Sequence, residues 1–544
     1  MHADELRSSH QAQRLIAAAV RRDPLAVVAR LEEQQAKVRQ LQTQVRRAES
    51  EVKAIGKDRG LIGRELREAQ KELKKLRPKK AAAPTAPPTA AAQEQPADDA
   101  SPAPEPEAGP QLSELSLEEI LARLEEHSAP KWLAAALNRL WYAHGALEQC
   151  LVLLIRHAEL VPEMTPGQRQ LADRIQGTAA LEENLERVVP RRADGPAYLP
   201  ERARVMYCAY STPAFHSNGY SVRTRGVVTG LRAAGADVFV VARSGYPWDI
   251  RNVEGTPSRR RRHVARVDGV EYVHLPEGDL AKMRADDYLQ IAADAFVREA
   301  RLQRPSLIHA ASNYLNALPA LIAARRLGLP FVYEVRGLWE VTEASAKEGW
   351  AETERYAWQA RMEAYVASHA DAVLAITQET KDELIRRGVP GERIEILPNG
   401  VDTDTFLPIP RDEQYAKSRG IAADVPVIGF AGSFVDYEGL DVLLQAANIL
   451  RGRKIGFQIA LAGGDGVYPE LKSYKERNKL GPRVRFVGRR PPEEIPRFLS
   501  CVDIVACPRK SLPVTEMVSP LKPLEAYAAS KPVVLSDVSP HRVL

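Results

Sequence analysis

A short turn near the C-terminal end combines residue types that bind a nucleotide. It reads Ser519-Pro520-Leu521-Lys522-Pro523-Leu524-Glu525 and is predicted to open a helix over residues 521–529. Free N–H groups at a helix start, together with the Lys522 ammonium group, favour a phosphate. Glu525, one helical turn further on, can accept two hydroxyl hydrogen bonds, as from a ribose. An ordinary proline-started helix with a capping charge would carry the same residues, so this turn alone leaves both interpretations open.

Three more loops have a glycine where backbone can approach a ligand. The segment HSNGYSVRTRG, residues 216–226, has Gly219 just before a helix predicted over residues 221–234. Gly432-Ser433 ends the predicted strand 427–431, and Gly488-Arg489 follows the predicted strand 484–487. For each loop taken alone, a plain turn is the better explanation. The last two and the 519–525 turn belong to one unit, and together they favour a nucleotide site there.

Alternating strands and helices position these loops from about residue 202 onward. Apolar runs of four to six residues separated by helical stretches are typical of a parallel α/β sheet. The break near residues 402–412 divides the pattern into two doubly wound units, residues 202–408 and 409–544, with a cleft between their strand ends. The predicted strands are 205–210, 237–242, 307–310, 331–334, 372–376, 395–397, 427–431, 458–462, 484–487, 504–506 and 532–535.

The first 195 residues follow a different, helical pattern. Two apolar positions per heptad over residues 25–77 predict a coiled coil within segment 1–80, and therefore a homo-oligomer. Gly56, Gly60 and Gly63 leave a helical hairpin open as the alternative. Residues 81–111 are rich in Ala and Pro and form an extended linker.

Residues 112–195 are predicted to form a small helical module. Ser116 and Glu119 make a capping box at its start, and an apolar stripe follows them. Its aromatic side chains are expected to lie in the core rather than in a ligand site.

Composition excludes several classes of protein. No apolar run among the 544 residues reaches the roughly 18 needed to cross a bilayer. The N-terminal sequence lacks the apolar core of a secretion signal. Four scattered cysteines form no CxxC pair, which argues against a disulfide framework and against zinc. We therefore expect a soluble cytoplasmic protein.

Positive charge gathers at two places. Residues 1–80 carry 20 Lys and Arg against 11 Asp and Glu, and a run of arginines covers residues 259–262. Either could contact anionic lipid at the inner face of a membrane, and the N-terminal arm could also contact nucleic acid. A solvated helix face and a solvated loop are the alternatives, and we expect no nucleic acid partner.

From residue 202 onward the chain resembles the family-4 retaining glycosyltransferases of GT-B fold. The resemblance follows the order of that family over nearly 340 residues and covers nothing before residue 202. Among the stretches that carry it are NGYSVRTRGVVTGLRAAGADVFVVAR (218–243), ILPNGVDTDTF (396–406), GFAGSFVDYEGLDVLLQA (429–446) and VSPLKPLEAYAASKPVVLSDV (518–538). It implies transfer of a sugar from a nucleotide-diphosphate donor with retention at the anomeric carbon.

The resemblance also assigns roles to residues. It implies that Glu525 holds the donor ribose, that Arg489 lies near the base, and that the turn 519–522 faces the diphosphate. Gly432, Ser433 and Glu516 complete the predicted donor site, and Asn218, Gly219 and Tyr220 form the loop on the acceptor side. Lys522, Arg336 and His309 are the predicted catalytic residues, with Glu340 on the same wall as the last two.

The chain departs from the family pattern at several positions. The usual acidic residue eight places before Glu525 is replaced by Met517, with Glu516 one step away. The usual Arg and Lys after the first strand of the second unit are replaced by Ser433 and Glu438, which leaves Lys522 as the principal cation. Relatives continue beyond the position of Leu544, so we expect a fragment or an incomplete enzyme.

The expected chemistry is electrostatic and needs neither cofactor nor metal. Amide groups and Lys522 would stabilise the departing diphosphate. Asp402-Thr403-Asp404 looks like a metal-binding DxD motif, but its place in a turn favours a chance match. The acceptor is expected to be a glycan or a lipid-linked precursor of a surface polysaccharide, whereas the donor sugar and base stay open. Two alternatives remain: a sugar-nucleotide epimerase of the same fold, and a non-catalytic nucleotide-binding or scaffold protein.

Overall fold

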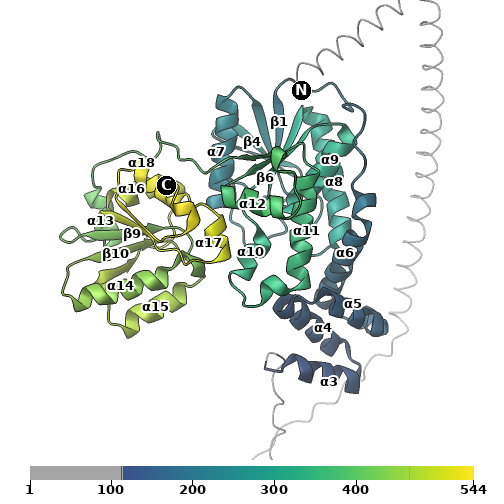
Figure 1. Cartoon of the computed structure of the whole chain (residues 1–544), viewed down its shortest axis with the longest axis horizontal. Helices are drawn as coiled ribbons and strands as arrows, with labels where there is room; N and C mark the ends of the chain where they lie inside the picture. The colour runs from purple at the N-terminus through teal and green to yellow at the C-terminus, as the bar shows by residue number, and fades with distance from the viewer. Residues whose placement is uncertain (1–111, 113, 465) are drawn as a thin grey trace, which may run out of the picture. The chain divides into compact units, whose positions relative to one another are not determined.

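The computed structural model describes residues 112, 114–464 and 466–544, and these residues form two sheets with their helices (Figure 1). The predicted coiled coil and the predicted linker lie outside the described residues. Within the described part, none of the helices combines the length and the apolar composition needed to cross a bilayer.

The first sheet has eight strands in the order β3-β4-β2-β1-β5-β6-β7-β8. All neighbours pair in parallel except β3 and β4, which form an antiparallel hairpin. The strands are β1 (Arg204–Ala209), β2 (Asp237–Ala242), β3 (His263–Val267), β4 (Val270–His274), β5 (Leu307–Ala311), β6 (Phe331–Val335), β7 (Ala372–Ala375) and β8 (Ile394–Ile396). The helices of this lobe are α7 (Gly219–Ala233), α8 (Ala285–Gln303), α9 (Tyr314–Leu327), α10 (Trp339–Ala344), α11 (Glu354–Ser368) and α12 (Gln378–Arg386).

The second sheet has five parallel strands in the order β11-β10-β9-β12-β13. They are β9 (Val427–Ala431), β10 (Gln458–Ala462), β11 (Val484–Phe486), β12 (Ile504–Cys507) and β13 (Val533–Leu535). Separate buried clusters contain side chains of its strands and helices, as expected for a doubly wound sheet. The helices here are α13 (Glu413–Arg419), α14 (Leu440–Gly452), α15 (Tyr468–Arg477), α16 (Ile495–Ser500), α17 (Pro513–Met517) and α18 (Lys522–Ala528).

The β3–β4 hairpin was missed by the sequence prediction. Its turn is Asp268-Gly269, with φ of +49° and +72°. An Asp-Gly pair between two short strands is a strong hairpin signal, because both residues tolerate the left-handed conformation that the turn requires. The arginine run leads directly into β3 and is partly tied into the fold: Arg260 donates to the carbonyls of Pro276 and Gly278, and Arg262 pairs with Glu299 at 2.7 Å.

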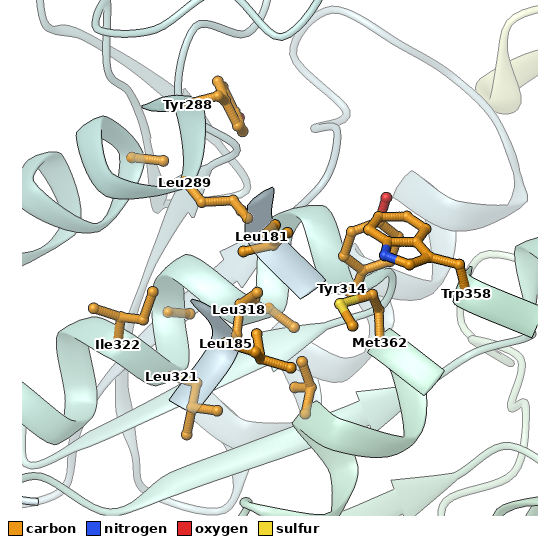
Figure 2. Close-up of a cluster of buried hydrophobic side chains, with 14 of the residues drawn as sticks. Leu181, Leu185, Tyr288, Leu289, Tyr314, Leu318, Leu321, Ile322, Trp358 and Met362 are labelled. Carbon is orange, nitrogen blue, oxygen red and sulfur yellow. The ribbon is translucent and has the colours of Figure 1, made fainter. Parts of the chain in front are cut away.

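In the described part of the chain, four α-helices precede the first sheet and share its hydrophobic core. They are α3 (Leu117–His127), α4 (Pro130–Arg139), α5 (Leu147–Arg156) and α6 (Pro166–Val188), and the Ser116–Glu119 capping box is present. Trp132 and Trp141 are buried in a cluster that continues without a break into α8, α9 and α11. Figure 2 shows Leu181 and Leu185 of α6 among side chains of these three helices. The hydrophobic core therefore continues across residue 195, where the sequence pattern changes from helical to alternating strands and helices.

Candidate active site

Loops at the carboxyl ends of β9 and β12 bring Gly432 and Lys522 together. These strands are neighbours and parallel, so their carboxyl ends lie at one edge of the sheet. Gly432 has φ of +151°, and a Cβ atom there would lie 2.5 Å from Cε of Lys522. Glycine is thus needed at position 432 for its backbone and for the lysine that crosses it. Ser433, the next residue, is exposed.

The Lys522 ammonium group is held by a buried carboxylate. Its Nζ donates to Oε1 of Glu438 at 2.8 Å and lies 5.2 Å from the centre of the Phe430 ring. The lysine side chain is 20% exposed, whereas that of Glu438 is 6% exposed, so only the cation faces solvent. Burial raises the pKa of Glu438, but the attraction of Lys522 and Arg509 outweighs it and leaves this pKa below its ordinary value.

Arg509 is a second cation beside Glu438 and was missed in the sequence. It follows β12, is buried, and donates from Nη1 to the carbonyl of Val518 at 2.7 Å. Its Nη2 lies 3.7 Å from Oε1 of Glu438. The signal that could have found it is a charged residue two places after a buried strand, at the edge where ligands of such sheets bind.

Glu525 lies on α18 and makes no hydrogen bond or ion pair with any residue that the structure describes. Its side chain is half-buried. Burial raises the pKa of this carboxyl group, and the attraction of Lys522 opposes the shift. A half-buried carboxylate without a partner costs free energy, which hydroxyl donors of a ligand would recover.

The turn before α18 is held by a hydrogen bond from Asn399, a residue distant in sequence. Ser519 and Pro520 are buried, Leu521 is half-buried, and the carbonyl of Ser519 accepts a hydrogen bond from Nδ2 of Asn399 at 2.7 Å. The helix begins at Lys522 and has seven residues, against the nine predicted. Because so short a helix has a small dipole, the site rests mainly on its side chains.

Glu516, unlike Glu525, is held by hydrogen bonds within the described part of the protein. Its carboxylate accepts hydrogen bonds from Oγ of Ser511 at 2.6 Å and from the backbone N–H of Ser539 at 2.8 Å. The hydrogen bond from Ser511 holds the pKa of Glu516 below its usual value. These bonds tie two loops together, and a contact between Glu516 and a sugar stays a prediction.

The predicted base-side residue Arg489 and the DxD motif, which was interpreted as a chance match, lie on separate loops. Arg489 is exposed and follows Gly488, whose φ is +79°; its Cγ would lie 3.5 Å from a Cβ at Gly464. Asp402 accepts hydrogen bonds from Asp404 N–H at 2.9 Å and from the Thr405 hydroxyl at 2.8 Å. The aspartate therefore closes a turn, which explains its presence there.

In the first lobe, the predicted acceptor loop is the start of α7. Asn218 caps the helix by accepting from the N–H of Ser221 at 2.9 Å. Gly219 begins the helix two residues earlier than predicted, and no described atom would obstruct a side chain there. The hydroxyl of Tyr220 accepts a hydrogen bond from the N–H of Tyr210 at 2.9 Å, so this residue is tied into the fold.

The predicted catalytic residues His309 and Arg336 surround a carboxylate that the sequence analysis overlooked. Glu334 is fully buried in β6 and accepts from Nε of Arg336 at 3.0 Å and Nε of Arg223 at 2.8 Å. Nε2 of His309 lies 3.4 Å away, without the direction of a hydrogen bond. Burial raises the pKa of Glu334, but the attraction of Arg336 outweighs it and holds this pKa well below normal.

All N–H donors of the Arg336 guanidinium group form hydrogen bonds within the first lobe. Besides Glu334 it reaches the carbonyl of Tyr220 at 2.9 Å, the hydroxyl of Thr224 at 2.7 Å, and the hydroxyl of Tyr207. In this arrangement none is left for a substrate. Glu340 is also buried and pairs with Arg387 at 2.6 Å, away from solvent.

Arg223, likewise missed, connects this network to the segment between the two sheets. Its guanidinium donates to the carbonyls of Leu397 and Pro398 and to Oδ1 of Asn399, at 2.7 to 2.9 Å. Asn399 in turn donates to Ser519. A glutamate inside the apolar strand FVYEV was the available signal, because a buried charge needs partners.

Comparison with known proteins gives the class to which this fold and site belong. A model described as "Glycosyl transferase 4-like domain" matches residues 218–400, and "Glycosyl transferases group 1" matches residues 425–544. Sucrose-phosphate synthase from Thermosynechococcus elongatus has a similar fold, with a TM-score of 0.50, 19% identity, and coverage of 62% of this chain and 82% of that one.

Two curated relatives agree with this class. The chain is 30% identical to the putative glycosyltransferase EpsF of Bacillus subtilis, over 43% of this chain and 57% of that protein. It is 26% identical to a GDP-mannose-dependent alpha-mannosyltransferase of Mycobacterium tuberculosis, over 60% of this chain and 79% of the relative. The two family models together cover more than half of the chain, which belongs to the family-4 glycosyltransferases of GT-B fold.

Proposed function

We propose that this glycosyltransferase moves a sugar from a nucleotide-diphosphate donor to a glycan or lipid-linked acceptor in surface-polysaccharide assembly, with retention at the anomeric carbon. The observation that carries the proposal is that one short helix, α18, carries both a solvent-facing ammonium group, Lys522, and a carboxylate without a hydrogen-bond partner among the described residues, Glu525. A cation beside a hydroxyl acceptor matches a diphosphate joined to a ribose. The name of the mycobacterial relative, which specifies GDP-mannose, supports a nucleotide donor.

Each part of the donor has a proposed partner. Glu525 accepts hydrogen bonds from the ribose hydroxyls, and Lys522 contacts the diphosphate across Gly432. The base lies near Gly488 and Arg489, where β11 ends.

In the proposed reaction, the bond between the anomeric carbon and the diphosphate oxygen breaks, and its electron pair goes to that oxygen. Lys522 stabilises the negative charge that develops there. The acceptor hydroxyl attacks the anomeric carbon from the same face, and its proton passes to the departing diphosphate oxygen on that face. We favour same-face attack over a carboxylate nucleophile because Glu525 is assigned to the ribose and Glu438 is paired with Lys522.

The proposal gives the first lobe a positioning role. Arg336 and His309 hold β1, β5, β6 and α7 in place around Glu334, and α7 presents the Asn218–Tyr220 loop to the acceptor. Oligomerisation through residues 25–77 and peripheral contact with a membrane are further parts of the proposal. They concern segments that lie mainly outside the described residues.

A thermal-shift screen of the full-length protein with nucleotide sugars tests the proposal, because a bound donor raises the melting temperature in relation to its affinity. Hits are then incubated with candidate acceptors in the presence and absence of EDTA, and the anomeric configuration of the product is read by NMR. We expect α-linked product from an α-linked donor, unaffected by EDTA. Epimer formation without acceptor would favour an epimerase, and the absence of saturable binding would favour a scaffold.

A further inference from the structure

Glu438 is a negative charge in a place that the proposed function reserves for a diphosphate. It lies on the loop after β9, and 4% of the residue is exposed. A buried anion beside an incoming anion is unfavourable unless it performs some task. The contacts of Glu438 show what that task is.

One oxygen of this carboxylate meets two cations that come from different loops. Oε1 lies 2.8 Å from Nζ of Lys522 and 3.7 Å from Nη2 of Arg509. The three side chains together carry one net positive charge. Oε2 of Glu438 and Nε of Arg509 are buried without a hydrogen-bond partner among the described residues, so the carboxylate and the guanidinium of this cluster each keep an unused polar atom.

The two cations have different surroundings. Arg509 is 5% exposed and bonds to the carbonyl of Val518, so it anchors the loop that leads to Ser519. Lys522 is 20% exposed and leans across Gly432, so its ammonium group is the part of the cluster that a ligand can reach. Without Glu438, this flexible side chain would have no fixed direction, and two cations would repel each other.

We propose that Glu438 is a positioning residue that fixes Lys522 and Arg509 as one unit for a pyrophosphate group. Ser433 and Glu438 stand on this loop where the family pattern has an Arg and a Lys. The cluster supplies positive charge instead from Arg509, which follows β12, and from Lys522, which begins α18. The inference rests on the proposed function, because it assumes that a nucleoside diphosphate leaves from this site.

A double-mutant cycle on the full-length protein tests the inference. Glu438→Gln keeps the shape and one acceptor oxygen but removes the charge, and Lys522→Gln removes the cation. The rate of diphosphate release from UDP-glucose and GDP-mannose is measured together with the affinities for UDP, GDP, UMP and GMP. We expect Glu438→Gln to slow release at least tenfold, and the double variant to be no slower than Lys522→Gln alone. The change in affinity should appear for diphosphates and be absent for monophosphates.

Asp436→Asn is the matched control, because Asp436 lies on the same turn and pairs with Lys510 at 2.7 Å in an exposed position. It should leave the release rate within twofold. Additive losses in the cycle, or a Glu438→Gln rate equal to that of the parent, would overturn the inference while leaving the glycosyltransferase proposal intact. A parent protein that binds and cleaves none of the probes would contradict both. A variant with a lowered melting temperature but parental rates would show a role in stability alone, which also overturns it.

Discussion

The two lobes differ in how far their charged side chains are paired within the protein. In the first lobe, Glu334 is fully buried and surrounded by Arg223, Arg336 and Tyr207, and Arg336 has no donor to spare. In the second lobe, Lys522 stays partly exposed and Glu525 lacks a partner among the described residues. A buried group whose hydrogen bonds are all made rigidifies the structure around it, whereas a group without a partner is free to bind a ligand. The difference fits the proposed donor site in the second lobe and predicts how each lobe should respond to mutation.

The largest effect should come from Glu334→Gln. It leaves two buried guanidinium groups without their counter-charge, and we expect the free energy of unfolding to fall by about 3–5 kcal/mol. Urea denaturation measures the change. Glu271→Gln is the control, since Glu271 pairs with the exposed Arg266 and should cost less than about 0.5 kcal/mol. A loss as small as the control's would mean that the first lobe does not depend on this network.

Lys522→Ala should have its main effect on the rate of sugar transfer. Removing the cation that meets the leaving group should slow sugar transfer by roughly 10²–10³-fold. Steady-state kinetics with the donor found by thermal shift provide the measurement, with Lys510→Ala as the control. Transfer at the parental rate would remove Lys522 from the mechanism.

Glu363 tests whether buried charge in the first lobe also governs the response to pH. Burial raises its pKa to about 8, so the folded protein keeps a proton that the unfolded chain releases above about pH 4.5. Stability from this group is therefore complete below pH 4.5 and falls as the pH rises toward 8. We expect Glu363→Gln to reduce this fall by about 1–3 kcal/mol in denaturation at pH 5 and pH 8. An exposed change, Glu352→Gln, should leave the slope as it is.

Glu525→Ala should weaken donor binding about tenfold or more while leaving the melting temperature of the free protein nearly unchanged. Calorimetric titration measures the affinity. The ribose assignment is sharpened with a 2′-deoxy donor, which should bind parent and variant more equally than the ribose form does. If both donors lose affinity to the same extent, Glu525 contacts another part of the nucleotide.

Deletion of residues 1–80 should have the smallest effect on either lobe. We expect donor affinity within twofold of the parent, together with a smaller oligomeric mass in light scattering. An affinity that falls with the mass would link assembly to the donor site.

Much of the fold was predictable because buried parallel strands read as short apolar runs. The strands 237–242, 427–431 and 458–462 were predicted with the bounds that the structure shows. The β3–β4 hairpin was missed because β3 is mostly half-buried and carries Arg266, so it lacks the apolar pattern of a buried strand. Its Asp-Gly turn was the better signal.

The site was predictable only in part, since spatial neighbours depend on strand order. The proximity of Lys522 to Gly432 follows from the pairing of β9 with β12, which lie far apart in the chain. The roles of Arg509 and Arg223 depend on carboxylates that reach them from other elements, and no local pattern shows such pairs. Arg336 was predicted to be catalytic from the family resemblance, but its internal hydrogen bonds could be counted only in the folded molecule.

The shared core around α6 has a practical consequence for work on the enzyme. Leu181 and Leu185 cover apolar side chains of the helices that flank the first sheet (Figure 2). A truncated protein beginning at the first strand, near residue 202, would expose these apolar side chains to solvent and would be prone to aggregate. Expression of the transferase without its N-terminal segment should therefore start ahead of Ser116, so that helices α3 to α6 continue to cover these side chains.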